Sequence, residues 1–176
     1  MSNYKEDFNT RKKYNIAEDK AVQFYDELDC FYTRYGLDLL NVGLNKSQFC
    51  KIPSLIRNTP DYLVIQKKCW LVEVKGCRDY LRLKFIDEGN YAKWNQICPV
   101  VYFIYSTVYE RHIQLPHRIL SNMILHNRYP VKQYPDNNKA YHEIPVDELY
   151  YKADKLNKLN DNKVVLDDGT RINGVR

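Results

Sequence analysis

The stretch TPDYLVIQKKCWLVEVKG, residues 59–76, decides the fold of this chain. It contains two apolar runs, residues 61–65 and 69–74, with two lysines between them. Aromatic and β-branched residues dominate both runs, and the polar residues between them are typical of a turn. The pattern therefore predicts a β-hairpin.

Two acidic residues and a lysine lie at the start of the first arm and at the end of the second arm of this hairpin. Asp61 opens the first arm, and Glu73 follows twelve positions later (73 − 61) in the second arm. If the arms pair antiparallel, both carboxylates come to the same end of the sheet. Residues two apart in a strand face the same way, so Glu73 and Lys75 project together while Val74 faces the core. Two carboxylates and an amine are thus expected in a small volume.

This set of groups suits metal-assisted cleavage of a phosphodiester. Carboxylate oxygens are the ligands that Mg²⁺ prefers, and one or two of them leave coordination positions open for water and phosphate. A lysine beside them can orient the water and stabilise the charge that develops in the transition state. If Asp61 were only a turn residue and Glu73 and Lys75 lay on a solvated strand face, their charges would need no catalytic role. Beside a buried strand, however, such charges cost several kcal/mol unless they are paired or metal-bound.

The stretch resembles the PD-(D/E)XK nuclease superfamily, which has the restriction-endonuclease-like fold. The matching residues are Pro60, Asp61, Glu73, Val74 and Lys75, and a glycine follows them as it often does in the family. The resemblance covers about residues 17–106 and is strongest to phage endonucleases that resolve branched DNA.

The resemblance implies a role for each residue of the motif. Asp61 and Glu73 would hold Mg²⁺, with Mn²⁺ as a substitute, assisted by the backbone carbonyl of Val74. Lys75 would orient the attacking water. The family often has a further acid on its first helix, and Glu18 in the segment AEDKAV is the candidate for a metal-binding or metal-positioning carboxylate. An acid near a helix N-terminus is also explained by the helix macrodipole, and Asp19 is its nearest rival.

The rest of the chain alternates helical and extended patterns. Helices are expected at residues 17–35, 79–97, 115–127 and 145–151, and further strands at 37–42, 100–105 and 141–144, the last as an edge strand. Together with the hairpin, these elements predict a small α/β or α+β domain, in which a central mixed β-sheet is flanked by helices. The resemblance implies that this α/β core is restriction-endonuclease-like. We expect a flexible segment at residues 1–16, one domain at 17–150 and a polar tail at 151–176.

Composition limits the class of protein. The chain has 176 residues, of which 44% are hydrophobic and 28% are charged, enough for one domain with a core. No apolar run is long enough for a signal peptide or a membrane span. Five cysteines form no C-x-x-C pair, so we expect an intracellular, cytoplasmic protein without a structural zinc site. The bias toward Lys, Asn and Tyr suggests an AT-rich genome, such as that of a phage or mobile element.

A net charge of +5 permits a nucleic-acid partner. The basic loop at residues 46–57 and the helix at 79–97 supply the candidate DNA contacts Lys46, Lys51, Arg57, Lys84 and Lys93. The loop has two other interpretations, a dimer contact or a soluble insertion, and the lysines of the helix equally suit a mixed surface. The four histidines (His112, His117, His126 and His142) lack metal-ligand spacing and are predicted to lie on the surface or to contact phosphates.

The sequence thus predicts a metal-dependent DNA endonuclease that works as a homodimer, without a membrane or small-molecule cofactor. The resemblance implies 5′-phosphate and 3′-hydroxyl ends, with branched DNA such as a Holliday junction as one substrate. A site-specific homing or restriction-like endonuclease and an exonuclease or repair nuclease remain alternatives. A degenerate nuclease fold that only binds DNA is the alternative outside enzymes.

Overall fold

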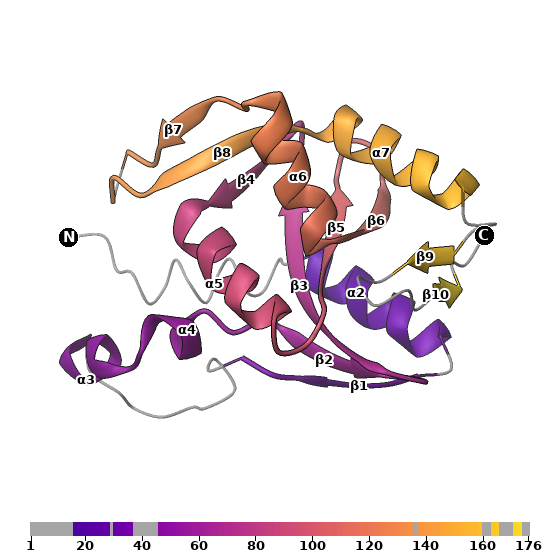
Figure 1. The fold of residues 1–176 in the computed structure, drawn as a ribbon, viewed down its shortest axis with the longest axis horizontal. Coiled ribbons are helices and arrows are strands. Elements are labelled where there is room, and N and C mark those ends of the chain that lie inside the picture. The colour runs from indigo at the N-terminus through magenta and orange to yellow at the C-terminus, as the bar shows by residue number, and fades with distance from the viewer. Residues whose placement is uncertain are drawn as a thin grey trace.

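A mixed sheet of five strands forms the centre of the protein (Figure 1). The computed structural model describes residues 16–28, 30–36, 46–135, 137–159, 163–165 and 171–173. The strands lie in the order β1 (Phe31–Arg34), β2 (Tyr62–Ile65), β3 (Cys69–Cys77), β5 (Val100–Ser106) and β6 (Arg111–Pro116). Because β3 pairs antiparallel with β2 and parallel with β5, the sheet is mixed, as the sequence predicts.

The predicted hairpin is formed by β2 and β3. Tyr62 pairs with Val72 and Ile65 with Cys69. β2 begins at Tyr62, whereas β3 continues along β5 as far as Cys77. The β2 side of β3 is therefore free of strand pairing beyond Val72 among the described strands, and this is the place where the site lies.

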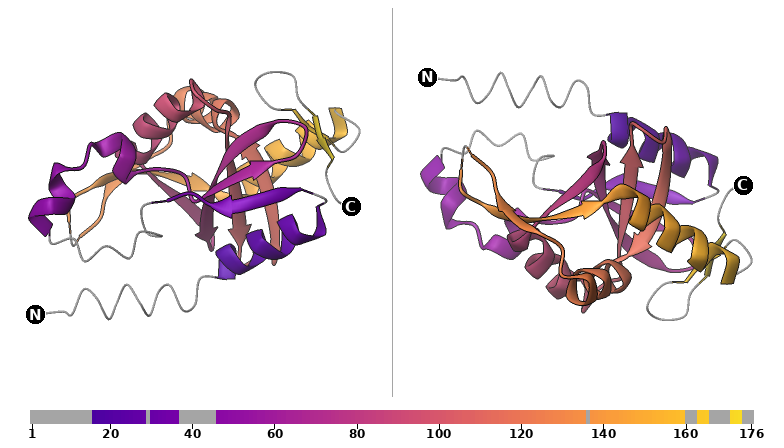
Figure 2. Two further views of the ribbon diagram at one scale, coloured as in Figure 1. Left: turned by 90° about the horizontal axis from the view of Figure 1, so that it is seen from below. Right: turned by 90° about the horizontal axis from the view of Figure 1, so that it is seen from above.

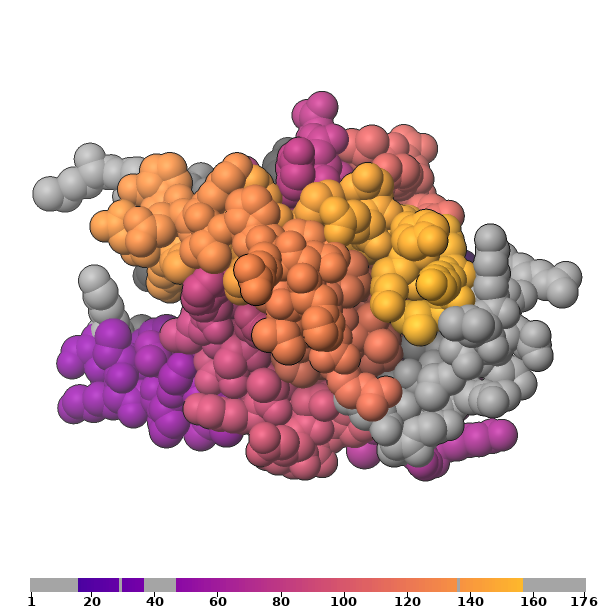
Figure 3. All heavy atoms as spheres, turned by 45° about the horizontal axis from the view of Figure 1, so that its top comes forward, coloured from indigo at the N-terminus to yellow at the C-terminus, as the bar shows by residue number. Residues whose placement is uncertain are grey.

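Helices cover both faces of the central sheet (Figure 2). On one face, α2 (Ile16–Glu27) packs Ala17, Ala21 and Phe24 into a core that includes Val72 and Val74. On the other face lie α5 (Phe85–Asn95), α6 (His117–Asn127) and α7 (Val146–Leu159), and α6 and α7 form much of the surface seen in Figure 3. Every residue of β5 is buried, as expected for a strand covered on both faces. The predicted fold class is confirmed: a central mixed sheet flanked by helices.

Smaller elements surround this core. A second antiparallel sheet has the strand order β4 (Tyr80–Lys84), β8 (Ala140–Pro145) and β7 (Val131–Gln133). Two short helices, α3 (Lys46–Lys51) and α4 (Ser54–Arg57), precede the hairpin, and β9 (Lys163–Val165) pairs with β10 (Arg171–Asn173). None of the described helices is both long and apolar enough to cross a membrane.

The helix predicted over residues 17–35 is too long. α2 ends at Glu27, and β1 then pairs antiparallel with β2. Phe31 and Tyr35, which the helical spacing places on the buried face, are exposed. Aromatic and β-branched residues in this stretch favour extended structure once the edge of β2 offers a hydrogen-bonding partner.

Two other expectations are corrected in the same way. The predicted loop at residues 46–57 contains α3 and α4, which are too short to show a helical period in the sequence. The predicted helix at 79–97 begins only at Phe85, because the preceding residues form β4. Leu81 and Leu83 are buried and alternate with exposed residues, which is the period of a strand.

Near the C-terminus the elements are longer than predicted. The strand expected at residues 141–144 is not at an edge, because β8 lies between β4 and β7. The short helix expected at 145–151 continues to Leu159, so the expected boundary between residues 150 and 151 falls inside α7.

The strand expected at 37–42 lies outside the described residues.

Candidate functional site

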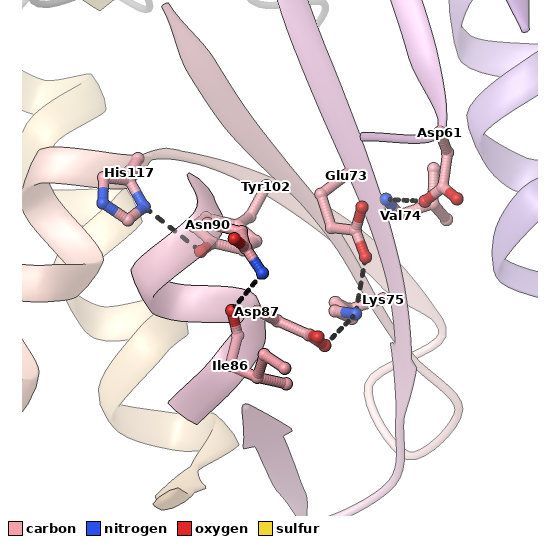
Figure 4. A network of polar contacts seen from close by, with 9 residues as sticks. All are labelled: Asp61, Glu73, Val74, Lys75, Ile86, Asp87, Asn90, Tyr102 and His117. Atoms are coloured by element: carbon pink, nitrogen blue, oxygen red, sulfur yellow. Dashed lines mark hydrogen bonds and ion pairs between the residues drawn. The ribbon is translucent and has the colours of Figure 1, made fainter. Parts of the chain in front are cut away.

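Asp61 and Glu73 meet at the end of the hairpin, as their spacing predicts. Asp61 directly precedes β2, and its Oδ2 accepts a hydrogen bond from the backbone N–H of Val74 at 2.7 Å (Figure 4). The aspartate side chain therefore continues, on the edge of β3, the pairing that β2 ends at Tyr62. Since the N–H and C=O of a residue in a strand point to the same side, the carbonyl of Val74 faces this edge as well.

Glu73 and Lys75 project from the other side of β3 and form an ion pair. The Lys75 Nζ lies 2.5 Å from Oε1 of Glu73. Glu73 is only 5% exposed, and within the described part of the chain its second oxygen, Oε2, is buried without a hydrogen-bond partner. The buried phenol of Tyr91 lies close enough to the Glu73 carboxylate for that charge to contribute to a raised Tyr91 pKa, after the larger effect of burial. An unsatisfied acceptor such as Oε2 costs free energy, so this oxygen indicates a place where a cation or a donor from a ligand is expected.

A third carboxylate, which the sequence analysis missed, completes the cluster. Asp87 lies in the first turn of α5, is buried, and places Oδ2 at 3.6 Å from the Lys75 Nζ. In Figure 4 Glu73, Lys75 and Asp87 point toward one another. The only signal of Asp87 in the sequence is an acidic first helical turn, which the helix macrodipole explains equally well.

The charges of this cluster shift its pKa values. Burial raises the pKa of Asp61 well above its usual range, and the charge of Glu73 adds to this, while Lys75 and the Val74 N–H oppose it. Burial lowers the pKa of Lys75, but the charges of Glu73, Asp87 and Asp61 outweigh it, so the net shift is upward and the amine stays protonated. Three carboxylates against one ammonium leave an excess of acid in a buried space.

The donor set fits a divalent cation only in an open form. No group of three or more His, Cys, Asp and Glu side chains is placed to hold a metal within the described parts of the chain. The available ligands are the carboxylates of Asp61 and Glu73 and the carbonyl of Val74. A set of one or two carboxylates with oxygen from the backbone or from water is typical of Mg²⁺ rather than of Zn²⁺.

Glu18 lies on α2, which covers the opposite face of the sheet from α5. It forms a short ion pair with Arg34 of β1. Its charge is still close enough to contribute, as the weakest of the causes, to the raised pKa of Asp61. The structure thus places Glu18 near Asp61 with a cation partner of its own.

The five candidate DNA contacts lie on α3, α4, β4 and α5, and α4 packs against α5, which carries Asp87. α4 is held against α5 by two hydrogen bonds, from Trp94 Nε1 to the carbonyl of Leu55 at 3.1 Å and from Asn90 Nδ2 to Ser54 Oγ at 3.2 Å. Lys51 is exposed, and the Arg57 guanidinium lies 5.6 Å from the centre of the Phe49 ring.

The other three candidates differ in their exposure. Lys84 ends β4 and is half-buried, and Lys93 is exposed in the last turn of α5. Lys46 begins α3, and its side chain lies outside the described part of the structure.

One of the histidines is not a surface residue. His117 is buried, with Nδ1 at 3.2 Å from the Tyr102 hydroxyl and Nε2 at 3.1 Å from Ser121 Oγ. His112 stacks on Phe103 with ring centres 4.6 Å apart. The predicted surface position is wrong for His117, because α6 packs it against the sheet, and His112 is half-buried.

The chain is similar to two solved nucleases. One is Hjc, a Holliday junction resolvase from the archaeal hyperthermophile Archaeoglobus fulgidus, at 9% identity and a TM-score of 0.43, over 78% of this chain and 98% of that chain. The other is D212, a nuclease from a fusselovirus, at 10% identity and a TM-score of 0.39, over 92% of this chain and 95% of that chain. No protein-family model and no curated protein matches the chain. These likenesses are remote.

Proposed function

We propose that the protein is a metal-dependent deoxyribonuclease of the PD-(D/E)XK type that cuts phosphodiester bonds within DNA and leaves 5′-phosphate and 3′-hydroxyl ends. One observation carries the proposal: Glu73 pairs with Lys75 through Oε1, and its Oε2 is buried beside Asp61 with no hydrogen-bond partner among the described residues. Such an arrangement is costly for stability alone, and a site for a cation and a phosphate explains it.

Each residue has a proposed role that follows from its position. Asp61 and Glu73 would bind Mg²⁺ or Mn²⁺ with the Val74 carbonyl. The ion would lower the pKa of a water molecule and neutralise charge on the scissile phosphate. Lys75, held protonated by its three acidic neighbours, would donate hydrogen bonds that orient the water and stabilise the developing charge. Asp87 would fix the position of the Lys75 amine.

The proposal extends to the DNA substrate and to the number of copies of the chain that act together. One active site cuts one strand, so symmetric cleavage of a branched substrate such as a Holliday junction requires two copies of the chain, and we propose a homodimer. A site-specific endonuclease would instead need base-edge contacts from a defined element. Nicking of a plasmid, of a four-way junction and of a linear duplex with free ends separates branch-selective, unselective and exonucleolytic activity.

Substitutions at the cluster test the chemistry. Asp61→Asn, Glu73→Gln and Lys75→Met should each lower the cleavage rate in Mg²⁺ at least about 100-fold, because each removes a charge that acts in the transition state. Double variants should lose little more than single ones, since the three groups act as a unit. Ca²⁺ should support binding of DNA without cleavage. Thermal unfolding of each variant separates loss of chemistry from loss of fold.

Two exposed residues of α7 provide matched controls. Asp147→Asn and Lys155→Met remove the same charges far along the chain from the hairpin and should leave cleavage unchanged. Cleavage by Lys75→Met at the wild-type rate, or full activity of the wild type in excess chelator, would refute the mechanism. Tight DNA binding by the wild type without cleavage in either metal would support the alternative of a DNA-binding subunit.

A further inference from the structure

The small sheet of β4, β8 and β7 has two unlike faces. Side chains alternate along each strand, so register decides which residues share a face. One face carries Leu81, Leu83 and Ile144, which are buried in the core with α5 to α7. The residues paired across the other face are polar or aromatic: Tyr80, Arg82, Lys84, Lys132, Tyr141 and Glu143. Tyr134 continues the alternation after β7, and its ring centre lies 4.4 Å from that of Tyr141. We call these seven residues the aromatic-basic face.

The aromatic-basic face is positively charged. Its only carboxylate among these residues, Glu143, holds both Arg82, at 3.8 Å, and Lys132. The side chains of Arg82 and Lys132 are nevertheless 55% and 53% exposed, and the Arg82 guanidinium lies 5.5 Å from the centre of the Tyr141 ring. One carboxylate for three cations leaves the face complementary to a polyanion. Tyr80, at 51% exposed, presents a ring beside these charges.

A pocket joins this face to the candidate active site. Its volume is about 430 Å³, and its lining includes Lys75 from the cluster and Tyr80, Arg82 and Tyr134 from the aromatic-basic face. Arg78 and Asp79, which pair at 3.5 Å, complete its charges, so three cations face one carboxylate. Burial raises the pKa of Tyr134, while the charges of Arg82 and Lys75 lower it, as expected for a phenol that lies between the face and the site.

We propose that the aromatic-basic face binds a single-stranded segment of DNA that continues from the scissile phosphate. Arg82 and Lys132 would contact its phosphates, and the rings of Tyr80 and Tyr134 would stack on its bases. Single strands offer both phosphates and base faces, whereas a duplex presents mainly phosphates to a sheet, so the exposed ring of Tyr80 and the half-buried ring of Tyr134 favour the single strand. The inference rests on the proposed nuclease function and adds a substrate feature to it: an unpaired arm next to the cut.

Binding without cleavage tests this assignment. The affinity of the full chain, in chelator, is measured for a blunt duplex and for the same duplex with a single-stranded DNA arm of about 10 nucleotides, a length within the usual range of such sites. We expect the arm to increase the affinity of the wild type about 10-fold or more. Tyr134→Ala should reduce this increase about 5-fold or more, and Tyr134→Phe should keep it, because the ring that stacks is retained.

The roles of Arg82 and Lys132 are tested with a variant that does not leave the Glu143 carboxylate without a partner. Arg82→Gln with Lys132→Gln and Glu143→Gln removes two cations together with their shared partner. This triple variant should lose the preference for the arm and keep the affinity of the wild type for the blunt duplex. Tyr151→Ala and Lys155→Gln on α7 are exposed controls that should retain the preference. Thermal unfolding confirms that each variant is folded.

The outcomes distinguish this inference from the proposed function. A folded triple variant or Tyr134→Ala with the full arm preference overturns the inference, and cleavage by the wild type then still supports the nuclease. Equal losses in Tyr134→Ala and Tyr134→Phe overturn the stacking role. A preference for an RNA arm over the DNA arm overturns the assignment to DNA. Absence of cleavage by the wild type on every substrate refutes the nuclease without altering the binding result.

Discussion

At the scale of single residues, Glu18 differs from the other candidate site residues in its partner. Asp61, Glu73 and Asp87 are near Lys75, whereas Glu18 forms its own pair with Arg34. Both side chains of that pair are about a quarter exposed, 24% for Glu18 and 27% for Arg34. A partly exposed pair stabilises a protein by only about 0–1 kcal/mol, so we expect loss of this pair to change stability little.

Two variants separate a role of Glu18 in cleavage from a purely structural role. If Glu18 serves the site, Glu18→Gln lowers the cleavage rate at least about 10-fold, raises the Mg²⁺ concentration needed, and changes stability by about 1 kcal/mol at most. Arg34→Gln removes the same pair but keeps the carboxylate, and should retain most cleavage. The exposed neighbour provides the control, Asp19→Asn. Normal cleavage by Glu18→Gln with equal losses of stability in both variants would make the glutamate structural.

His112 links stability to pH. Burial lowers its pKa from the ordinary value near 6.5; the charges of Arg111 and Lys20 act in the same direction, and Glu27 opposes them. Below pH 6.5 the unfolded chain therefore binds a proton that the folded protein resists, so stability present above that pH is lost as pH falls. Thermal unfolding between pH 8 and pH 5 should show a smaller fall for His112→Phe than for the wild type. Parallel curves would contradict this.

At the scale of elements, the contact between α2 and β3 depends on a glycine next to the site. A Cβ built on Gly76 would lie 3.3 Å from the Cβ of Ala17, which belongs to the buried face of α2. The Cβ of Ala17 is fixed by the helix backbone and cannot rotate away. The close packing of α2 on the second half of β3 therefore favours a residue without a side chain directly after Lys75.

Gly76→Ala should destabilise the protein by about 1 kcal/mol or more, because α2 must shift to relieve the overpacking. In a domain of this size this lowers the melting temperature by about 2–4 °C per kcal/mol. Gly89→Ala in α5 is the matched control: no atom lies within 4 Å of the added Cβ, and alanine in a helix should stabilise by about 0.5–1 kcal/mol. Equal stabilisation by both variants would show that α2 moves freely.

At the scale of the whole molecule, basic residues from separate parts of the chain lie around one acidic cluster. α4, which carries Arg57, is held against α5, and a pocket joins Lys75 to the aromatic-basic face. A buried acidic centre between basic surfaces matches a polyanion that must place one phosphate at a cation site.

Salt dependence measures how many phosphates are bound. If about 4–6 phosphates are neutralised per protomer, the logarithm of the binding constant should fall against the logarithm of salt concentration with a slope of roughly −4 to −5. Neutralising Lys46, Lys51 and Arg57 together should make the slope shallower by about 2–3. A wild-type slope in this triple variant would instead assign the backbone contacts to the aromatic-basic face or to the basic segment at residues 111–139.

The sequence by itself determined the hairpin and the meeting of its charged residues. The placement of Asp61, Glu73 and Lys75 follows from two local rules, antiparallel pairing across a short turn and alternation of side chains in a strand. The burial of β5 also follows from its composition. The same local rules were insufficient at residues 17–35 and 79–97, because a stretch with several apolar residues fits helical and extended spacing equally well until a partner strand is known.

Only the tertiary structure decided which distant residues join the hairpin. Asp87 reaches Lys75 because β4 ends and α5 begins at Phe85, and the burial of His117 depends on the packing of α6. The aromatic-basic face combines residues 80–84, 131–134 and 140–145, which become neighbours through pairing of strands far apart in the chain. Local periodicity indicates which residues share a face, but the free energy of packing the whole core decides what covers that face.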